Sequence, residues 1–300
     1  MNPQKNNPVN NPVIFIDGSY FCFYRYHATL TWWKFSHSDP NQDQVQASDP
    51  SLNPEFIEKF KKSFTDGIAS LPKKLGVSKD SIIIVGKDCK RSDIWRHEFA
   101  HNYKGTRPSN ESIGAFFAMV YNEELFLKGG AKMIIEHSRL EADDVIAISV
   151  KRLLSENAKR KIIVVTSDKD YLQLLRPTNN SNNDSNSDSN SVRIFNASIK
   201  NIGVTKEGAL VDGHKELFIK TVMGDKSDNI SSAIAKCGYK TAEKCYHDRN
   251  YFESRLEKEP LARQAYLNNK KLVDFDEIPA ILVAEFWGEY GGKVMDLFDT

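Results

Sequence analysis

The chain has 300 residues, of which 40% are hydrophobic and 27% are charged, which is typical of a folded globular protein and not of a collagen-like or disordered one. Its formal net charge is +1, and its length predicts one large or two modest domains. No run of 18 or more apolar residues occurs, which argues against a membrane-spanning helix.

The first residues and the cysteines bear on location. Residues 1–12 are rich in Asn and Pro and lack the apolar core of a signal peptide, so we expect a disordered tail there. The four cysteines form no CxxC pair and no zinc-type spacing, which predicts reduced thiols. Together these features predict a cytoplasmic protein that is not secreted.

Apolar runs and helical periodicity alternate along the first half of the chain. Four short apolar runs predict buried strands at 13–16, 81–87, 132–135 and 161–165. Apolar residues at helical spacing predict a helix at about 54–75, and further helices are expected at about 93–103, 110–127 and 141–155. The aromatic-rich residues 20–36 are expected to form a helix followed by a loop. This alternation predicts an α/β fold with a mostly parallel central sheet and helices on both faces.

The second half of the chain differs in pattern. Residues 178–191 are almost entirely Asn, Ser and Asp, which predicts a disordered loop. Residues 192–195 and 201–204 are expected to pair as a hairpin. Short helical patterns follow from residue 213. We therefore expect an α/β core over 13–212 and a helical region over 213–300.

Acidic residues follow the predicted strands. Asp17, Asp88 and Asp168 each come directly after a strand, and the stretch LEADD (140–144) begins a helix shortly after another. Because the carboxyl ends of parallel strands meet at one edge of a sheet, and ligands of such sheets bind there, we expect these acids to gather.

Each acid also has a structural explanation. Ser138 and Glu141 fit a capping box, with Ser138 as the N-cap. Asp143 and Asp144 would favour the helix dipole, and the other acids could cap turns. Their common position instead favours divalent cations such as Mg²⁺, which take oxygen ligands, and no His or Cys cluster favours zinc. Two ions about 3.5–4 Å apart can clamp the attacking and leaving oxygens of a phosphodiester.

Six features in order, between about residues 13 and 248, resemble one family. They are FIDGS, Asp88, WRHEFAHNYKGTRP, LEADD, TSDKDYLQLL and GDKSDNI. This set resembles the flap endonuclease / 5′-nuclease superfamily, which includes the 5′→3′ exonuclease domain of bacterial DNA polymerase I and phage-type RNase H. The length and the segment LVDFDEIP (272–279) are most similar to stand-alone phage-type RNase H. The resemblance implies a PIN-like nuclease core, a helical gateway at about 90–127 and a helix-three-turn-helix at about 227–248.

The resemblance also implies two Mg²⁺ ions, for which Mn²⁺ can substitute. The first ion would be surrounded by Asp17, Asp88, Glu141, Asp143 and Asp144. The second would be held by Asp168, Asp170 and Asp228, with Asp144 shared between the ions and Asp225 acting through water. Setting these nine acids aside leaves 31 of the 40 acidic residues against 41 basic ones, which suits a polyanionic substrate.

Further roles follow from the same resemblance. Asp144, Lys104 and Arg107 would be catalytic, and the two basic residues would contact the scissile phosphate. The implied nucleic-acid contacts are Arg96 to phosphate, Tyr103 to a stacked base, Lys104, Arg107, and the duplex-backbone contacts of Gly238, Lys240 and Thr241. Family members often bind K⁺ in that turn, and residues 231–235 replace its usual Pro/Gly-rich half, so K⁺ binding stays open here.

The resemblance implies a monomeric, metal-dependent 5′ nuclease that removes RNA primers or 5′ flaps from DNA and RNA–DNA duplexes in replication and repair. A polymerase, a clamp or a single-strand-binding protein would be a partner by analogy. A haloacid-dehalogenase-type phosphatase is an alternative, but it needs a second Asp where this chain has Ser19. A non-catalytic protein that binds DNA junctions is the other alternative. The preference between exonuclease and flap cleavage, and between RNA and DNA, stays open.

Overall fold

The computed structural model describes residues 12–37, 52–107, 111–175 and 191–298. The tail predicted at 1–12 and the loop predicted at 178–191 lie outside these ranges, except for residues 12 and 191. Across these ranges, no helix combines the length and the apolar character needed to cross a membrane.

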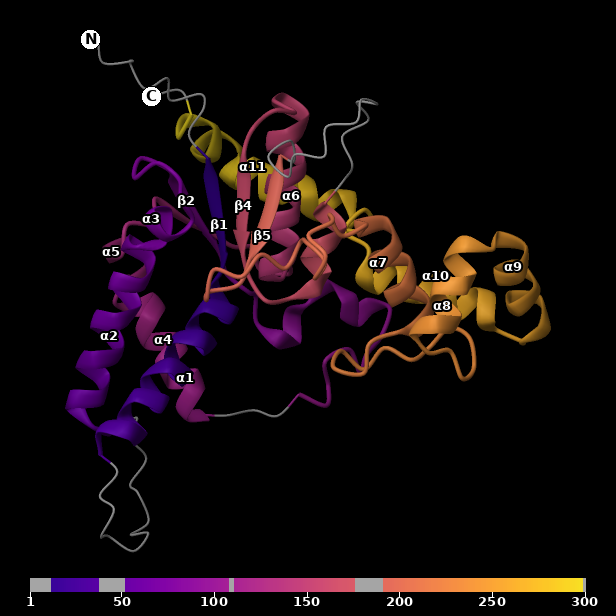
Figure 1. The fold of residues 1–300 in the computed structure, drawn as a ribbon, viewed down its shortest axis with the longest axis horizontal. Helices are drawn as coiled ribbons and strands as arrows, with labels where there is room; N and C mark the ends of the chain where they lie inside the picture. The colour runs from indigo at the N-terminus through magenta and orange to yellow at the C-terminus, as the bar shows by residue number, and fades with distance from the viewer. Residues whose placement is uncertain (1–11, 38–51, 108–110, 176–190, 299–300) are drawn as a thin grey trace, which may run out of the picture.

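A five-stranded parallel sheet forms the centre of the protein (Figure 1). Its strand order is β3-β2-β1-β4-β5, and every neighbouring pair is parallel. The strands are β1 (Val13–Asp17), β2 (Ile82–Gly86), β3 (Met133–Ile135), β4 (Ile162–Val165) and β5 (Val192–Phe195). Because Asp17 pairs with Gly86, β1 and β2 end at the same level, and the residues that follow them emerge side by side. The predicted mostly parallel α/β fold is therefore confirmed.

The last strand differs from the prediction. Residues 192–195 were expected to form a hairpin with 201–204, but β5 pairs in parallel with β4, and Val165 lies opposite Phe195. Only an isolated antiparallel bridge joins Phe195 to Asn201. Val192 and Ile194 are buried in the core of the sheet, and their backbone satisfies the hydrogen-bonding edge of β4. Burial against a distant strand outweighed the local pairing.

Helices cover both faces of the sheet, because successive side chains of a strand point to opposite faces. On β1, Val13 and Phe15 enter one core, and Ile14 and Ile16 enter the other. The first core is closed by α6 (Ala142–Glu156) and α11 (Ala280–Asp296). The second is closed by α1 (Gly18–Ser36), α2 (Pro54–Ala69), α3 (Leu71–Lys74), α4 (Glu111–Asn122) and α5 (Leu125–Lys128). Figure 1 shows these helices on either side of the strands.

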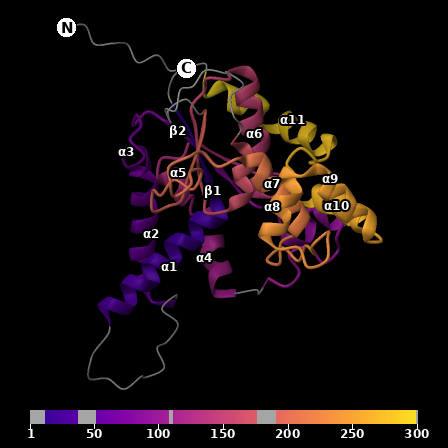
Figure 2. The ribbon, with the colours of Figure 1, turned by 45° about the vertical axis from the view of Figure 1, so that its right-hand side comes forward.

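Four helices form a lobe beside the sheet (Figure 2). They are α7 (Gly213–Met223), α8 (Tyr239–His247), α9 (Arg249–Lys258) and α10 (Ala262–Val273). The lobe has a small core of its own, in which Ile219, Val222 and Phe252 are buried. Helix α11 also lies within 213–300, but its Leu282 and Phe286 pack in the core of the sheet. The last helix of the described chain therefore belongs to the sheet by packing.

The predicted gateway is less helical than its sequence suggests. The helix expected at 93–103 is wrong: the segment forms two short 3₁₀ helices, Arg91–Asp93 and Trp95–Glu98, followed by turns. Buried side chains at irregular spacing explain the difference, because Ile94 and Tyr103 pack in a small cluster with Ile230 of the lobe. The helix expected at 110–127 is divided into α4 and α5 at Glu124, whose φ is 55°.

Candidate metal centre

Asp17 joins the ends of two central strands. It ends β1 and caps α1, where its Oδ1 accepts a hydrogen bond from the Tyr20 backbone N–H at 3.0 Å. Its Oδ2 accepts a hydrogen bond from the Thr166 hydroxyl, just past β4, at 3.1 Å. Gly18 permits the start of α1 to lie close to the end of β2, since a Cβ there would lie 2.6 Å from the carbonyl oxygen of Gly86.

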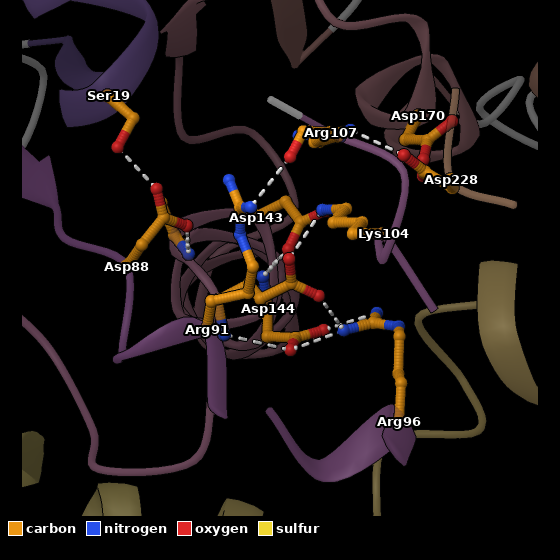
Figure 3. Close-up of polar contacts among 12 residues, drawn as sticks. Ser19, Asp88, Arg91, Arg96, Lys104, Arg107, Asp143, Asp144, Asp170 and Asp228 are labelled. Carbon is orange, nitrogen blue, oxygen red and sulfur yellow. Dashed lines mark hydrogen bonds and ion pairs between the residues drawn. The ribbon is translucent and has the colours of Figure 1, made fainter. Parts of the chain in front are cut away.

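Asp88 follows β2 and reaches two other elements. Its Oδ1 accepts a hydrogen bond from the backbone N–H of Ala142, the first residue of α6, at 2.7 Å. Its Oδ2 accepts a hydrogen bond from the hydroxyl of Ser19 in α1 (Figure 3). The carboxylates that follow β1 and β2 therefore lie at the start of α1 and of α6, at the predicted edge of the sheet.

The first turn of α6 carries the LEADD acids. Glu141 occupies the N-cap position, and Asp144 accepts a hydrogen bond from the Glu141 backbone N–H at 3.1 Å. The prediction that Ser138 is the N-cap is wrong, because an antiparallel bridge between His137 and Leu140 closes a turn before the helix begins. Oxygens of Glu141, Asp143 and Asp144 lie within 4.8 Å of one another, and within the described ranges this is the group suited to a metal ion.

A buried arginine holds two of these acids. Both carboxylate oxygens of Asp144 accept hydrogen bonds from Arg96, at 2.7 and 2.8 Å (Figure 3). Arg96 also donates to Glu141 at 2.8 Å. The Trp95 indole N–H adds a bond to Asp144 at 2.9 Å. Arg96 is 1% exposed, so the expected contact between Arg96 and a substrate phosphate does not fit this structure.

These contacts distinguish two adjacent acids. Asp144 accepts four hydrogen bonds, from Arg96, the Trp95 indole and the Glu141 backbone, which oppose the predicted role as a ligand shared between two ions. Glu141 is held less firmly, because one of its oxygens bonds Arg96 and the other pairs with the partly buried Lys104 ammonium. Asp143 is only half-buried and accepts the Asp144 backbone N–H at 2.8 Å. No basic side chain of the described residues lies within ion-pair distance of Asp143. The arrangement therefore favours Asp143 as the ligand and Asp144 as the residue that anchors Arg96.

Two predicted basic residues lie at the centre. The Lys104 ammonium pairs with Glu141. The Arg107 guanidinium pairs with Asp228 (Figure 3). The Lys104 backbone N–H also bonds the Asp228 carbonyl at 2.9 Å. Tyr103, which was expected to offer a ring to a base, is 3% exposed, and the Lys104 ammonium lies 5.1 Å from its ring centre. A base would reach this ring only after the segment moved.

Sequence reasoning did not find Lys220. Its ammonium pairs with Asp170, lies 2.9 Å from Asp225 and lies 4.0 Å from Asp228. A lysine in the last turn of a helix is common, because it interacts favourably with the helix dipole, so the position of Lys220 in α7 did not indicate a place in the site. Asp168 completes this group, because it accepts the Asp170 backbone N–H at 2.9 Å.

Crowding changes the acidity of the site. Burial, followed by the charge of Asp88, raises the pKa of Asp17 to about 7. Burial raises the pKa of Asp170 to about 6 despite the nearby Lys220, and burial with the charge of Asp144 raises the pKa of Asp143 well above its ordinary value. Burial also acts to raise the pKa of Asp225, but hydrogen bonds from Lys220 and Ser227 outweigh it and lower that pKa to about 2. Oxygen donors with this excess of negative charge fit hard divalent cations.

The predicted duplex contacts lie apart from the acids, in the lobe. Gly238 is the N-cap of α8, and Lys240 and Thr241 stand in its first turn. Gly238 and Lys240 are exposed, so backbone N–H groups and a lysine are available at this helix start. A helix N-terminus favours anionic groups such as phosphate.

Comparisons with known proteins agree with this fold. Residues 12–201 match the family described as 5′-3′ exonuclease, N-terminal resolvase-like domain. Ribonuclease H of Enterobacteria phage T4 is 26% identical over 254 residues, which cover 75% of this chain and 76% of that protein. DNA polymerase I of Treponema pallidum (strain Nichols) is 26% identical over 159 residues, which cover 51% of this chain and 14% of that polymerase.

Solved structures share the fold. A T5 5′-exonuclease with bound divalent zinc ions has a TM-score of 0.60 at 17% identity, covering 96% of this chain and 100% of that one. A bacteriophage T5 flap endonuclease, in a pseudo-enzyme–product complex with DNA and metal ions, has a TM-score of 0.59 at 16% identity, covering 97% of this chain and 100% of that one. At this level of identity the likeness shows the fold alone.

We expect Arg96→Ala to lower the free energy of unfolding by about 3–5 kcal/mol, because the change leaves Asp144 and Glu141 buried without their partner. The measurement is urea denaturation at neutral pH without divalent cations. Arg152→Ala is the control, since Arg152 forms an exposed pair with Glu156 and should cost no more than about 0.5 kcal/mol. Equal losses in the two variants would contradict the proposed importance of the buried pair.

Protons should compete with divalent cations at this site. Because the folded pKa of Asp17 lies above its ordinary value of 3.8, its stabilising contribution to the metal-free protein is complete below about pH 3.8 and is lost as pH rises through about 7. A cation takes the place of that proton. From Asp17 alone, we expect cation affinity to be roughly 20-fold weaker at pH 5.5 than at pH 7.5.

The melting temperature, recorded with Mg²⁺ and with EDTA at the two pH values, gives the measurement. The rise caused by Mg²⁺ should be larger at pH 7.5 than at pH 5.5. An equal or larger rise at pH 5.5 would show that protonation of these acids does not oppose the cation.

Proposed function

Because the chain belongs to the 5′-3′ exonuclease family, we propose that it is a Mg²⁺-dependent 5′ nuclease that hydrolyses phosphodiesters at 5′ ends or flaps of DNA and RNA–DNA duplexes. One observation carries the proposal. The acids that follow β1, β2 and β4 lie beside the first turn of α6 and the turn of the lobe that carries Asp228. Lys104 and Arg107 pair with acids of this group. Such a site suits a cation and a phosphate together.

We assign the acids to two cations. Asp17, Asp88, Glu141 and Asp143 would surround the first, and Asp168, Asp170 and Asp228 would hold the second, with Asp225 acting through water. When bound, such cations supply a Lewis acid for the phosphate and lower the pKa of the attacking water. Asp144 would act through Arg96, which orients the first turn of α6. Mn²⁺ would substitute for Mg²⁺, since both take carboxylate oxygens.

The basic side chains would bind the substrate. Lys104 and Arg107 already sit against Glu141 and Asp228, so a cation that neutralises these acids would release two positive groups beside the scissile phosphate. There they would stabilise the charge that develops on its oxygens. Lys220 would keep Asp170 and Asp225 together while no cation is bound.

Duplex binding would come from the lobe. The backbone N–H of Gly238, the Lys240 ammonium and the Thr241 hydroxyl would contact phosphates without reading the sequence. The DNA complex of the T5 flap endonuclease supports DNA as the substrate. The T4 relative, named ribonuclease H, supports the inclusion of RNA–DNA hybrids. Binding of K⁺ in the turn before α8 rests on the resemblance alone. In this turn the Ser232 hydroxyl lies 2.7 Å from the Ile234 carbonyl oxygen, to which it donates, and 3.1 Å from that of Val222.

The same proposal gives the cellular setting. A monomeric nuclease of this kind would work inside the cell at replicating DNA. A polymerase, a clamp or a single-strand-binding protein would then be its partner.

We expect the protein to cleave a 5′-flap duplex, an RNA–DNA hybrid, or both, with Mg²⁺ and not with EDTA. Asp143→Ala should lower the cleavage rate by about 1000-fold, because a cation contributes several kcal/mol to the transition state, yet flap binding should stay within a few-fold. Gel-based cleavage and fluorescence anisotropy measure the two quantities. Asp93→Ala, which removes an exposed carboxylate, should keep the wild-type rate. No cleavage of either substrate by the wild-type protein would leave the non-catalytic junction-binding alternative.

Lys240→Ala should weaken flap binding equally for unrelated sequences. It should also reduce the slope of log affinity against log salt by about 0.9, since one phosphate contact is lost. Lys79→Ala is the matched control, because Lys79 is exposed just before β2, at the end of the sheet opposite the acids. A slope that changes equally in both variants would argue against a phosphate contact at the start of α8.

A further inference from the structure

A few buried polar atoms of the described residues have no hydrogen-bond partner. They are Arg25 Nε, the Tyr121 hydroxyl, Arg160 Nε and Nη1, and the Tyr171 hydroxyl. A buried tyrosine hydroxyl usually finds a partner, and leaving one unpaired costs free energy. Tyr171 is 0% exposed, so bulk water does not supply that partner. Phenylalanine would fill the same space without the unpaired group, so the hydroxyl calls for an explanation.

The position of Tyr171 supplies one. It follows Asp170 directly in the 3₁₀ helix Lys169–Leu174, whose N-cap is Asp168. Its ring is buried in the sheet core and lies 6.1 Å from the ring of Phe275. The acids that act most strongly on its hydroxyl belong to the candidate metal centre: Asp17, Asp143, Asp168 and Asp88. The charges of the site therefore act on the hydroxyl, although it forms no hydrogen bond with any of these acids.

The protonation state suits a donor. The ordinary pKa of a phenol is about 10. At neutral pH the phenol keeps its proton and has it available for a hydrogen bond. Tyr121, the other tyrosine with an unpaired hydroxyl, packs on the opposite face of the sheet, where the Cys22 thiol acts on it most strongly and Asp88 and Asp17 follow.

We propose that Tyr171 is a positioning residue of the metal centre, whose hydroxyl donates a hydrogen bond to a carboxylate or water oxygen in the shell of a bound divalent cation. This proposal rests on the proposed function, because it requires that cation to bind. Groups that hydrogen-bond to metal ligands orient them, and their loss typically weakens metal binding 10–100-fold. The bond would help to orient the carboxylates of Asp17 and Asp143.

Tyr171→Phe tests this inference, with Tyr290→Phe as the matched control. Tyr290 is also a buried tyrosine of the same core, but the acids that act on its hydroxyl are Glu289 and Glu136. Mg²⁺ binding is measured by isothermal titration calorimetry on the full chain, and the metal-free melting temperature is recorded with EDTA. Cleavage of the flap duplex is then followed as a function of Mg²⁺ concentration.

We expect Tyr171→Phe to bind Mg²⁺ about tenfold more weakly than the wild-type protein and than Tyr290→Phe. Its metal-free melting temperature should be unchanged or higher, because the change removes an unpaired buried group. Its cleavage should need about tenfold more Mg²⁺ and approach the wild-type rate at saturation.

Three outcomes would overturn the inference. One is wild-type Mg²⁺ affinity in Tyr171→Phe. Another is a fall in the metal-free melting temperature with no change in affinity, which would mean that the hydroxyl serves only the fold. The third is an absence of Mg²⁺ binding by the wild-type protein, which would overturn the proposed metal centre together with this inference. The first two outcomes would overturn the role of Tyr171 alone.

Discussion

The buried guanidinium of Arg96 holds the site together. It donates to both oxygens of Asp144, to Glu141 and, through Nε, to the Leu272 carbonyl at the end of α10 at 2.8 Å. One side chain therefore connects the gateway segment, the first turn of α6 and the helical lobe. Burying a charge is costly unless its hydrogen bonds are satisfied, and here they are. This arrangement places Asp143 at the surface of the site while Asp144 turns inward.

The chain also supplies countercharges to its own acids. Lys104 pairs with Glu141, Arg107 with Asp228, and Lys220 with Asp170 and Asp225. These pairs explain how so many carboxylates lie together, although burial still raises the pKa of Asp17 and Asp143. Under the proposed function, cations and a phosphate would exchange with the same side chains. Binding of the metal and binding of the substrate would then be linked through Lys104 and Arg107.

Local patterns of the sequence located the acids well and described their partners poorly. Asp17, Asp88 and Asp168 were placed by the apolar runs that precede them, because a buried strand and the residue after it are adjacent in the chain. The pairing of Asp144 with Arg96 spans 48 residues, so no periodicity within a helix could reveal it. Neighbouring residues of a helix point in different directions, and only the packing of α6 decided that Asp143 stays half-buried. Lys220 was missed for the same reason.

The sequence by itself determined the alternation of strands and helices, the parallel sheet and the edge at which the acids gather, since these depend on hydrophobic periodicity and chain order. Only the tertiary structure decided that β5 joins β4 in parallel, that α11 packs on the sheet, and that the gateway begins as two 3₁₀ helices. It also decided that Arg96 and Tyr103 are buried and that the Tyr171 hydroxyl is buried without a partner. Each of these depends on burial against residues distant in the chain, which outweighs local preference.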